Sequence, residues 1–264
     1  MKRIGVIALA VLTSCMFIAS CMNTTSDSTT KTTITGSVKE TSGLSVGDHI
    51  MFGNYPQNYA PGSDTAEPEP VEWRVLEIKD GKALIISEYL LEPAVYYIEP
   101  ADVTWETSTL RKWLNTTFYD TAFSESEKSS IQTVTVKNPD NPLHGTKGGN
   151  DTEDKVFCLS LDEAKLYFKD KNDRMAAPTK YAVKRGAKIN EDSTLANGMN
   201  TGWWWLRTPA SSSNRASDVD CYGNIDDVIV QGRDVDGSLV FDEENCVRPA
   251  VWVTIPEAGF SKVL

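Results

Sequence analysis

The sequence predicts an α+β fold with a mixed sheet, two or three helices and a long loop-rich C-terminal region. Three observations predict it. Residues 71–86 and 247–255 contain the short alternating or apolar runs of strands, and amphipathic runs with capping-box starts lie between them. Residues 210–245 are dominated by Ser, Asn, Asp, Gly and Arg. No Pro/Gly/Ser-rich linker or repeat divides residues 45–264, so we expect a single domain there.

The strands come first in the predicted domain, and helices follow. Residues 71–75 alternate apolar and polar side chains, Lys79–Lys82 is a hairpin-turn signal, and residues 83–86 return as a more buried strand. Four helical signals follow, namely the apolar series Leu110, Trp113, Leu114 and Phe118, the capping boxes Ser124–Glu127 and Ser160–Glu163, and a short helix Thr179–Arg185 behind Pro178.

The last third predicts short strands separated by turns. Trp203–Leu206 is an expected strand, with Trp203 and Trp205 on one face and Trp204 on the other. Turn chemistry predicts hairpin tips at residues 222–224 and 235–237, with short strands at 228–230 and 238–241. A final alternating strand covers 247–255, and Pro249 places it, or its start, at an edge or irregularity.

Composition excludes several classes of protein. The 264 residues hold 26 Lys+Arg against 37 Asp+Glu, a formal charge of −11, so no broad cationic surface exists for a nucleic-acid backbone. Hydrophobic residues make up 40% and aromatic residues 9%, which suffices for a packed core. The chain is therefore neither wholly disordered nor a polytopic membrane protein.

The N-terminus reads as an export signal. Lys2 and Arg3 precede an apolar run, and Ile18-Ala19-Ser20-Cys21 resembles a bacterial lipobox. We expect residues 1–20 to be a lipoprotein signal peptide and Cys21 to be the lipidated first residue. The alternative is an ordinary cleaved signal with an incidental cysteine. Cleavage of residues 1–20 would remove Lys2 and Arg3 and shift the formal charge from −11 to −13.

Residues 21–44 are expected to form a tether between the lipidated Cys21 and the domain. Twelve of the twenty residues from 23 to 42 are Ser or Thr. The segment holds too few apolar residues for burial of its side chains to offset the entropy lost on ordering. The expected location is the bacterial cell envelope, with the domain anchored to a membrane by lipid and exposed at the surface.

Three cysteines lie inside the expected domain, Cys158, Cys221 and Cys246. An odd number in an exported protein permits one disulfide and one leftover thiol. We favour Cys221 with Cys246, because both flank the same loop-rich region. The alternative is three buried, unpaired cysteines.

Several motifs together resemble a known family. They are Phe52-Gly53-Asn54-Tyr55-Pro56-Gln57, Glu72-Trp73-Arg74, Trp204-Trp205-Leu206-Arg207-Thr208-Pro209 and Val247-Arg248-Pro249-Ala250. This set is similar to a widespread uncharacterised bacterial domain with no established activity. Its organisation resembles the C-type-lectin-like fold shared with formylglycine-generating enzymes, and the lipid-anchored variable proteins of diversity-generating retroelements. The resemblance implies a stable frame that displays a loop-rich C-terminal patch.

Catalytic and metal signals are weak. The only histidines are His49 and His144, and no cysteine or carboxylate partners stand at zinc-ligand spacing. Cys221 and Cys246 lie too far apart in sequence for the paired cysteines of formylglycine-generating enzymes. We therefore expect no enzyme and no cofactor. Calcium is a weak option at Asn150, Asp151 and Asp154, or at Asp234, Asp236, Ser238 and Asp242, where turn-forming residues are the alternative interpretation.

The loop-rich region is the candidate binding surface, since it combines aromatic and hydrogen-bonding side chains on loops. The candidate residues are Trp203, Tyr222, Asn224, Asp226, Asp227, Arg233 and Asp234. Arg207 and Arg248 are expected to brace the frame. The favoured hypothesis is a monomeric surface lipoprotein that binds a protein or glycan. The alternatives are an enzyme on the same frame, a structural envelope protein, and a loop with no partner.

Overall fold

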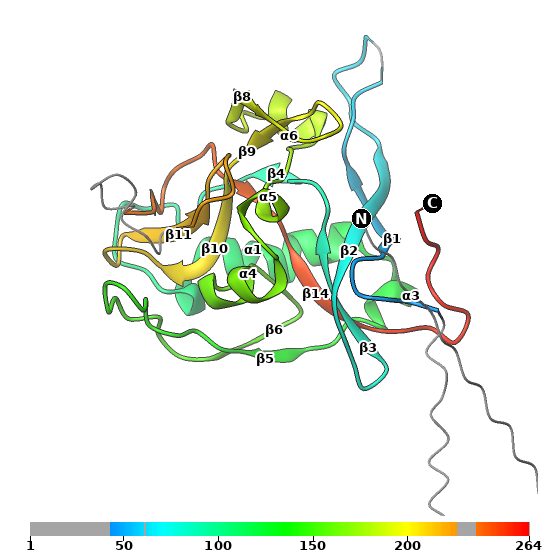
Figure 1. The fold of residues 1–264 in the computed structure, drawn as a ribbon, viewed down its shortest axis with the longest axis horizontal. Coiled ribbons are helices and arrows are strands. Elements are labelled where there is room, and N and C mark those ends of the chain that lie inside the picture. The colour runs from blue at the N-terminus through cyan, green and yellow to red at the C-terminus, as the bar shows by residue number, and fades with distance from the viewer. Residues whose placement is uncertain (1–42, 61, 226–235, 264) are drawn as a thin grey trace, which may run out of the picture. The chain divides into compact units, whose positions relative to one another are not determined.

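The computed structural model describes residues 43–60, 62–225 and 236–263, and these form a mixed α+β domain, as the sequence predicts. Two five-stranded sheets carry most of it (Figure 1). The first has the order β1 (His49–Pro56), β2 (Pro68–Lys79), β3 (Lys82–Ser87), β14 (Ala250–Thr254), β7 (Val156–Phe157). The second has the order β12 (Ser238–Leu239), β11 (Arg215–Val219), β10 (Trp204–Pro209), β13 (Cys246–Val247), β4 (Glu92–Pro93).

Two small ribbons and several short helices surround the sheets. The ribbons pair β5 (Val134–Val136) with β6 (Thr152–Asp154), and β8 (Ile189–Thr194) with β9 (Asn200–Gly202). The helical segments are η1 (Trp105–Thr107), α1 (Thr109–Trp113), η2 (Leu114–Phe118), α2 (Tyr119–Ala122), α3 (Glu125–Lys128), α4 (Leu161–Tyr167), α5 (Lys171–Arg174) and α6 (Lys180–Lys184). None of the helices in the described ranges is long and apolar enough to cross a bilayer.

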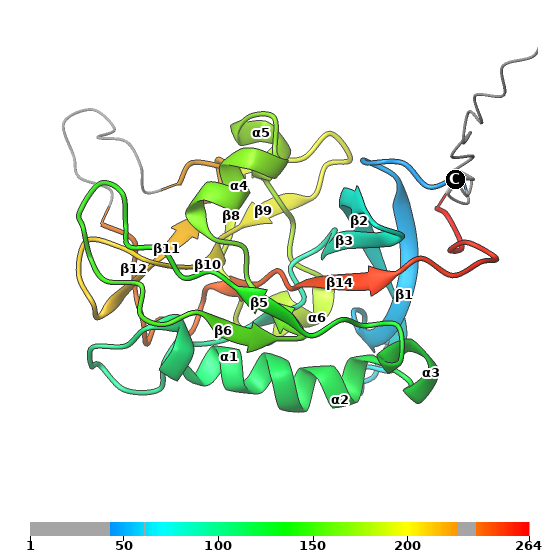
Figure 2. The same cartoon turned by 90° about the horizontal axis from the view of Figure 1, so that it is seen from below.

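Local sequence signals explain most of these elements. Asp80 and Gly81 both have positive φ and close the β2–β3 hairpin at the predicted turn. Both predicted capping boxes form, at Ser124 for α3 and at Ser160 for α4. The predicted helix around residues 110–118 is longer than expected, because α1, η2 and α2 follow one another without a break (Figure 2).

Several elements differ from the sequence prediction. The expected strand 247–255 is divided into β13 and β14, which lie in different sheets. Helix α5 was not predicted; its N-cap is Asp170, whose carboxylate accepts hydrogen bonds from the backbone N–H groups of Asn172 and Asp173. The expected strand 203–206 begins one residue later, at Trp204, and runs to Pro209. Trp203 lies between β9 and β10 and pairs through its carbonyl with the Cys246 N–H.

The two tryptophans of β10 fill the core on its opposite faces. Trp204 and Trp205 are both fully buried. Trp204 lies against Phe168, with ring centroids 6.1 Å apart, and Trp205 lies against Tyr96 at 5.7 Å. Most of this aromatic mass therefore stabilises the fold, which leaves Trp203 as the partly exposed member of the triplet.

Two buried arginines brace the frame, as expected. The Arg207 guanidinium donates to the carbonyls of Lys137 and Cys158 and forms a bidentate pair with Glu163. Arg248, which is fully buried, joins β13 to β14 where the chain passes from one sheet to the other. Its guanidinium donates to the carbonyls of Ser87 and Arg174.

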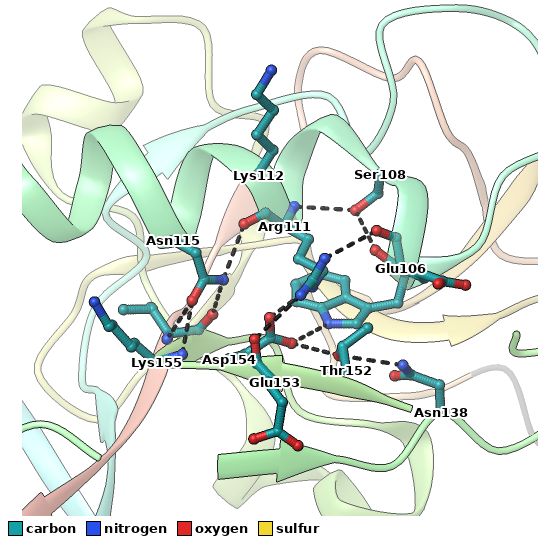
Figure 3. Close-up of polar contacts among 12 residues, drawn as sticks. Glu106, Ser108, Arg111, Lys112, Asn115, Asn138, Thr152, Glu153, Asp154 and Lys155 are labelled. Carbon is teal, nitrogen blue, oxygen red and sulfur yellow. Dashed lines mark hydrogen bonds and ion pairs between the residues drawn. The ribbon is translucent and has the colours of Figure 1, made fainter. Parts of the chain in front are cut away.

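A buried carboxylate ties the helical side of the domain to the β5–β6 ribbon (Figure 3). The side chain of Asp154 is fully buried and accepts hydrogen bonds from Trp105 Nε1 at 2.9 Å, Thr152 Oγ1 at 2.7 Å and Arg111 Nε at 2.6 Å. Asn115 completes the join, since its Oδ1 accepts from the N–H groups of Lys155 and Val156. These polar residues therefore hold the structure together rather than face a ligand.

The predicted disulfide is absent. Cys158, Cys221 and Cys246 are all buried and unpaired, which is the alternative that the sequence left open. Cys246 lies on β13 and Cys221 just beyond β11, on the two sides of β10. Two strand spacings are about 9.5 Å, whereas bridged Cα atoms lie at most about 7 Å apart. Burial raises the pKa of all three thiols, that of Cys158 to about 12.

Candidate functional site

The described ends of the C-terminal loop region are tied together at its base. The carbonyl of Asp236 accepts hydrogen bonds from the Ser211 N–H and hydroxyl. Arg215 donates to the Gly237 carbonyl, and the Val240 N–H to the Asn214 carbonyl. Residues 211–214 and 236–240 are therefore held next to β11 at the edge of the second sheet. This arrangement is consistent with a rigid scaffold under loops.

A tight turn at residues 220–224 positions Tyr222. The Asp220 carboxylate accepts hydrogen bonds from the N–H groups of Tyr222 and Asn224 and from the Asn224 side-chain amide. Gly223 has φ +75°, and a Cβ on it would lie 1.7 Å from the Lys171 carbonyl oxygen, so only glycine fits this approach to α5. Asn224 is thus used within the turn, while the Tyr222 side chain is 45% exposed.

Residues at the start of the β8–β9 ribbon contact both Trp203 and Tyr222. Asn190 Nδ2 donates to the Tyr222 hydroxyl at 2.9 Å and lies 3.1 Å from Cys221 Sγ. Two residues earlier, the Lys188 ammonium lies 4.5 Å from the centre of the Trp203 ring. Lys188, just before β8, and Asn190, its second residue, therefore each contact one of the two aromatic side chains. We call Lys188, Asn190, Trp203 and Tyr222 the aromatic face.

Hydrogen bonds beneath the aromatic face hold the turn to the ribbon. The Cys221 carbonyl accepts from the hydroxyls of Ser193 and Thr201, both buried. Lys188 is fixed from the other side, because its N–H donates to the Glu244 carbonyl. The aromatic face is therefore preorganised by β8, β9 and the chain leading to β13.

Sequence reasoning found two of these four residues. It selected Trp203 and Tyr222, and it missed Lys188 and Asn190, whose role depends on contacts between segments far apart in the chain. The candidates Asp226, Asp227, Arg233 and Asp234 lie outside the described residues, as do the predicted strand 228–230 and Cys21.

Asp218 is a buried carboxylate in the floor of this region. It lies on β11, where Ser238 Oγ donates to its Oδ2 at 2.5 Å and Asn245 Nδ2 lies 3.4 Å away. Burial, with smaller contributions from Asp220 and Asp242, raises the pKa of Asp218 to about 6. Its charge therefore depends on pH within the mildly acidic range.

A shallow cavity adjoins the same region. It has a volume of about 510 Å³ and combines hydroxyl groups with one carboxylate and one ammonium. Ser213 contributes one wall from the C-terminal region. The others come from residues 102–107 and 145–147, namely Asp102, Val103, Thr104, Thr107, Gly145, Thr146 and Lys147.

The described residues do not assemble a recognisable catalytic group. Cys158 is fully buried, and its raised pKa leaves it protonated at neutral pH. His49 pairs with Glu72 at 2.7 Å on the first sheet. The backbone N–H of His144 donates to Asn141, inside a loop of residues 141–145. Within the described ranges, no three His, Cys, Asp or Glu residues are grouped as a metal site.

The proposed calcium oxygens have other partners. Asp154 is the buried carboxylate of Figure 3, and Asp151 pairs with Lys137. Asn150 Nδ2 donates to Glu106 Oε2 at 3.0 Å. Asp234 lies outside the described residues, while Asp242 Oδ1 accepts from the Glu244 N–H, as in a turn. Of these contacts, that of Asp242 fits the turn-forming interpretation, while Asn150, Asp151 and Asp154 bind residues elsewhere in the fold.

A comparison with protein families matched one model. The model of a domain of unknown function, DUF6273, covers residues 80–255. That span includes β3, every described helix, the aromatic face and all of β14. Comparisons with curated proteins and with solved structures found no match.

Proposed function

The chain belongs to the DUF6273 family of unknown function, and from that premise we propose that it is a surface-exposed lipoprotein that binds a ligand through its C-terminal region. The observation that carries the proposal is the aromatic face. Asn190 contacts Tyr222 and Lys188 contacts Trp203 at the start of the β8–β9 ribbon, and Tyr222 is 45% exposed. Aromatic rings beside amide and ammonium groups are typical of adaptable binding surfaces.

The N-terminal sequence supplies the other half of the proposal. Cys21 carries the lipid, residues 21–44 act as a tether, and the domain projects from a membrane of the bacterial cell envelope. The ligand is a protein or a glycan, and the domain binds it as a monomer. The proposal includes a C-type-lectin-like frame, which superposition of an experimental structure on members of that fold tests.

The test uses protein produced without its lipid as a Cys21→Ser variant, labelled with a fluorophore. Binding is measured on intact bacteria and on an array of defined glycans. We expect the further double change Trp203→Ser/Tyr222→Ser to weaken binding at least tenfold, because it removes both aromatic side chains of the aromatic face.

Leu166→Ser is the matched control, since Leu166 is 73% exposed on α4 and lies outside the aromatic face. It is expected to bind like the parent. Equal binding by parent and double variant, with both folded by circular dichroism, contradicts the proposal.

A further inference from the structure

A second surface stands out by its charge. Residues 180–188 read Lys-Tyr-Ala-Val-Lys-Arg-Gly-Ala-Lys, four cations and no acid, in a chain whose formal charge is −11. They comprise α6 and its exit toward β8, beside the β8–β9 ribbon (Figure 1). A local excess of one sign on an oppositely charged protein creates a distinct field that attracts an anion.

Three of the four cations lie over aromatic rings. Lys184 Nζ is 4.1 Å from the centre of the Tyr59 ring, and the Arg185 guanidinium is 5.5 Å from that of Tyr181. Lys188 lies over Trp203 at 4.5 Å. Tyr59 and Tyr181 are themselves stacked, with centroids 5.7 Å apart and an interplanar angle of 27°. The surface thus places partly exposed aromatic rings directly beside positive charges.

A cavity of about 230 Å³ opens beside the stacked rings. Lys180 lines it together with polar groups and one methionine, namely Gln57, Asn58, Tyr89, Thr179 and Met199. The Tyr181 N–H donates to the Gln57 carbonyl, which fixes α6 against the segment that carries Tyr59. The side-chain nitrogens of Gln57 and Asn58 donate to Pro70 and Glu69, which turns both amides into fixed groups of the wall.

The cations are poorly neutralised. Neither the Lys180 nor the Lys188 ammonium has an ion pair among residues 43–60, 62–225 and 236–263. Lys184 pairs with Asp64, but the two side chains are 46% and 99% exposed, so this contact is worth little and an incoming anion can replace it. Arg185 is held more firmly, since its partner Glu92 is only 10% exposed.

We infer that the α6 surface, defined as Tyr59, Lys180, Tyr181, Lys184 and Lys188 with the adjoining cavity, binds an anionic polysaccharide. Sugar rings pack their apolar faces on Tyr59 and Tyr181, while carboxylate, sulfate or phosphate groups pair with the lysines. Sugar hydroxyls suit the amide and hydroxyl groups of the cavity. The inference rests on the proposed function only through Trp203, which the Lys188 contact shares with the aromatic face.

The chemistry favours this occupant over two other anionic surfaces. A nucleic acid would meet the same lysines, and the polysaccharide is favoured over it by the amide and hydroxyl groups of the cavity, which suit its many sugar hydroxyls. A membrane surface is disfavoured because insertion needs several exposed apolar side chains beside the cations. Within α6, Val183 is the single exposed large apolar residue, and it is 40% exposed.

The test measures binding of the full chain, with Cys21→Ser to avoid lipid, by isothermal titration calorimetry. The probes are polygalacturonate, dextran sulfate and neutral dextran, with phosphatidylglycerol vesicles and single-stranded oligo(dT) alongside. We expect binding to the two anionic polysaccharides that weakens with salt, and at least tenfold weaker binding to neutral dextran, vesicles and oligo(dT).

Variants assign the binding to the surface. Lys180→Ser/Lys184→Ser is expected to weaken polysaccharide binding at least fivefold. Lys79→Ser/Lys112→Ser removes the same charge elsewhere and is expected to change it less than twofold; in Figure 3, Lys112 points away from the buried network. Tyr59→Ser is expected to weaken binding, and Tyr59→Phe, which keeps the ring, is expected to retain it.

Three results overturn the inference: no binding to either anionic polysaccharide, equal losses in the two double-lysine variants, or equal affinity for vesicles or oligo(dT). Trp203→Ser/Tyr222→Ser is measured on the same probes. Suppose that Trp203→Ser/Tyr222→Ser no longer binds intact bacteria and that the parent binds neither anionic polysaccharide. This inference then fails while the proposed function stands.

Discussion

The carboxylate of Asp154 is the single polar group whose replacement is expected to loosen the domain most clearly. It joins η1, α1 and β6 through Trp105, Arg111 and Thr152 (Figure 3). Asp154→Asn keeps the size and shape of the side chain, so the change tests the hydrogen bonds and the charge rather than packing.

The magnitude follows from the geometry. The amide oxygen of asparagine can still accept from Trp105 and Thr152, but its NH₂ group then faces Arg111 Nε at a site where the carboxylate oxygen lay 2.6 Å away. One charge-assisted bond, worth about 1.5–3 kcal/mol, is lost. Arg111, only 25% exposed, keeps its charge without that partner. We expect a total loss of about 3–4 kcal/mol in the free energy of unfolding.

The assay is urea and thermal unfolding followed by circular dichroism. A loss of this size corresponds to a fall in Tm of about 10 °C for a domain of this length. Asp120→Asn is the control, because Asp120 is 70% exposed and its pair with Lys128 is worth less than about 1 kcal/mol. Asp154→Asn/Arg111→Met is expected to recover part of the loss, since it removes the unpaired cation. Stability of Asp154→Asn within 1 kcal/mol of the parent refutes the reasoning.

Three further predictions concern pH, thiols and lipid. The pKa of Asp218 is raised to about 6 in the folded protein, against an ordinary value of 3.8, so between these values the folded state holds more protons than the unfolded state. The contribution of Asp218 to the free energy of unfolding, up to about 3 kcal/mol, is present below pH 4 and is lost as pH rises through 6. In urea unfolding at pH 4.5, 5.5 and 7, the stability of Asp218→Asn is expected to decline less with rising pH than that of the parent. Parallel pH dependence of the two proteins contradicts this. Protein produced from residue 22 onward and unfolded without reductant is expected to expose three thiols to Ellman's reagent, whereas a count of one indicates a disulfide. Bacteria fed labelled palmitate are expected to label the parent chain and not Cys21→Ser, and an unlabelled parent is evidence against the lipobox.

Signals that act within a few residues were readable from the sequence. The capping boxes at Ser124 and Ser160 formed because the side chain and the N–H it accepts from are three residues apart. The Asp80-Gly81 turn formed because both residues tolerate positive φ. The bracing roles of Arg207 and Arg248 followed from residue chemistry, although their partners did not.

Contacts between distant segments were not readable. The pairing of Asn190 with Tyr222 joins residues 32 positions apart, and no local pattern marks it. The disulfide prediction failed for the same reason, because proximity of Cys221 and Cys246 in the loop-rich region says nothing of the strand that separates them. The α6 surface had a signal in its four cations, but the rings beneath them come from residues 59, 181 and 203.

The position of β14 has a consequence for how the chain reaches its folded state. This strand lies between β3 and β7, and residues 261 and 263 hydrogen-bond with residues 49–51. The first sheet therefore closes only after residues 250–263 have joined residues 49–87. Pairings across some 165–210 residues form slowly, because the entropy of closing a long loop is lost before the contacts form. The export that we propose requires a chain that has not yet folded, and this arrangement suits it, because the N-terminal strands cannot complete their sheet until residues 250–254 are available.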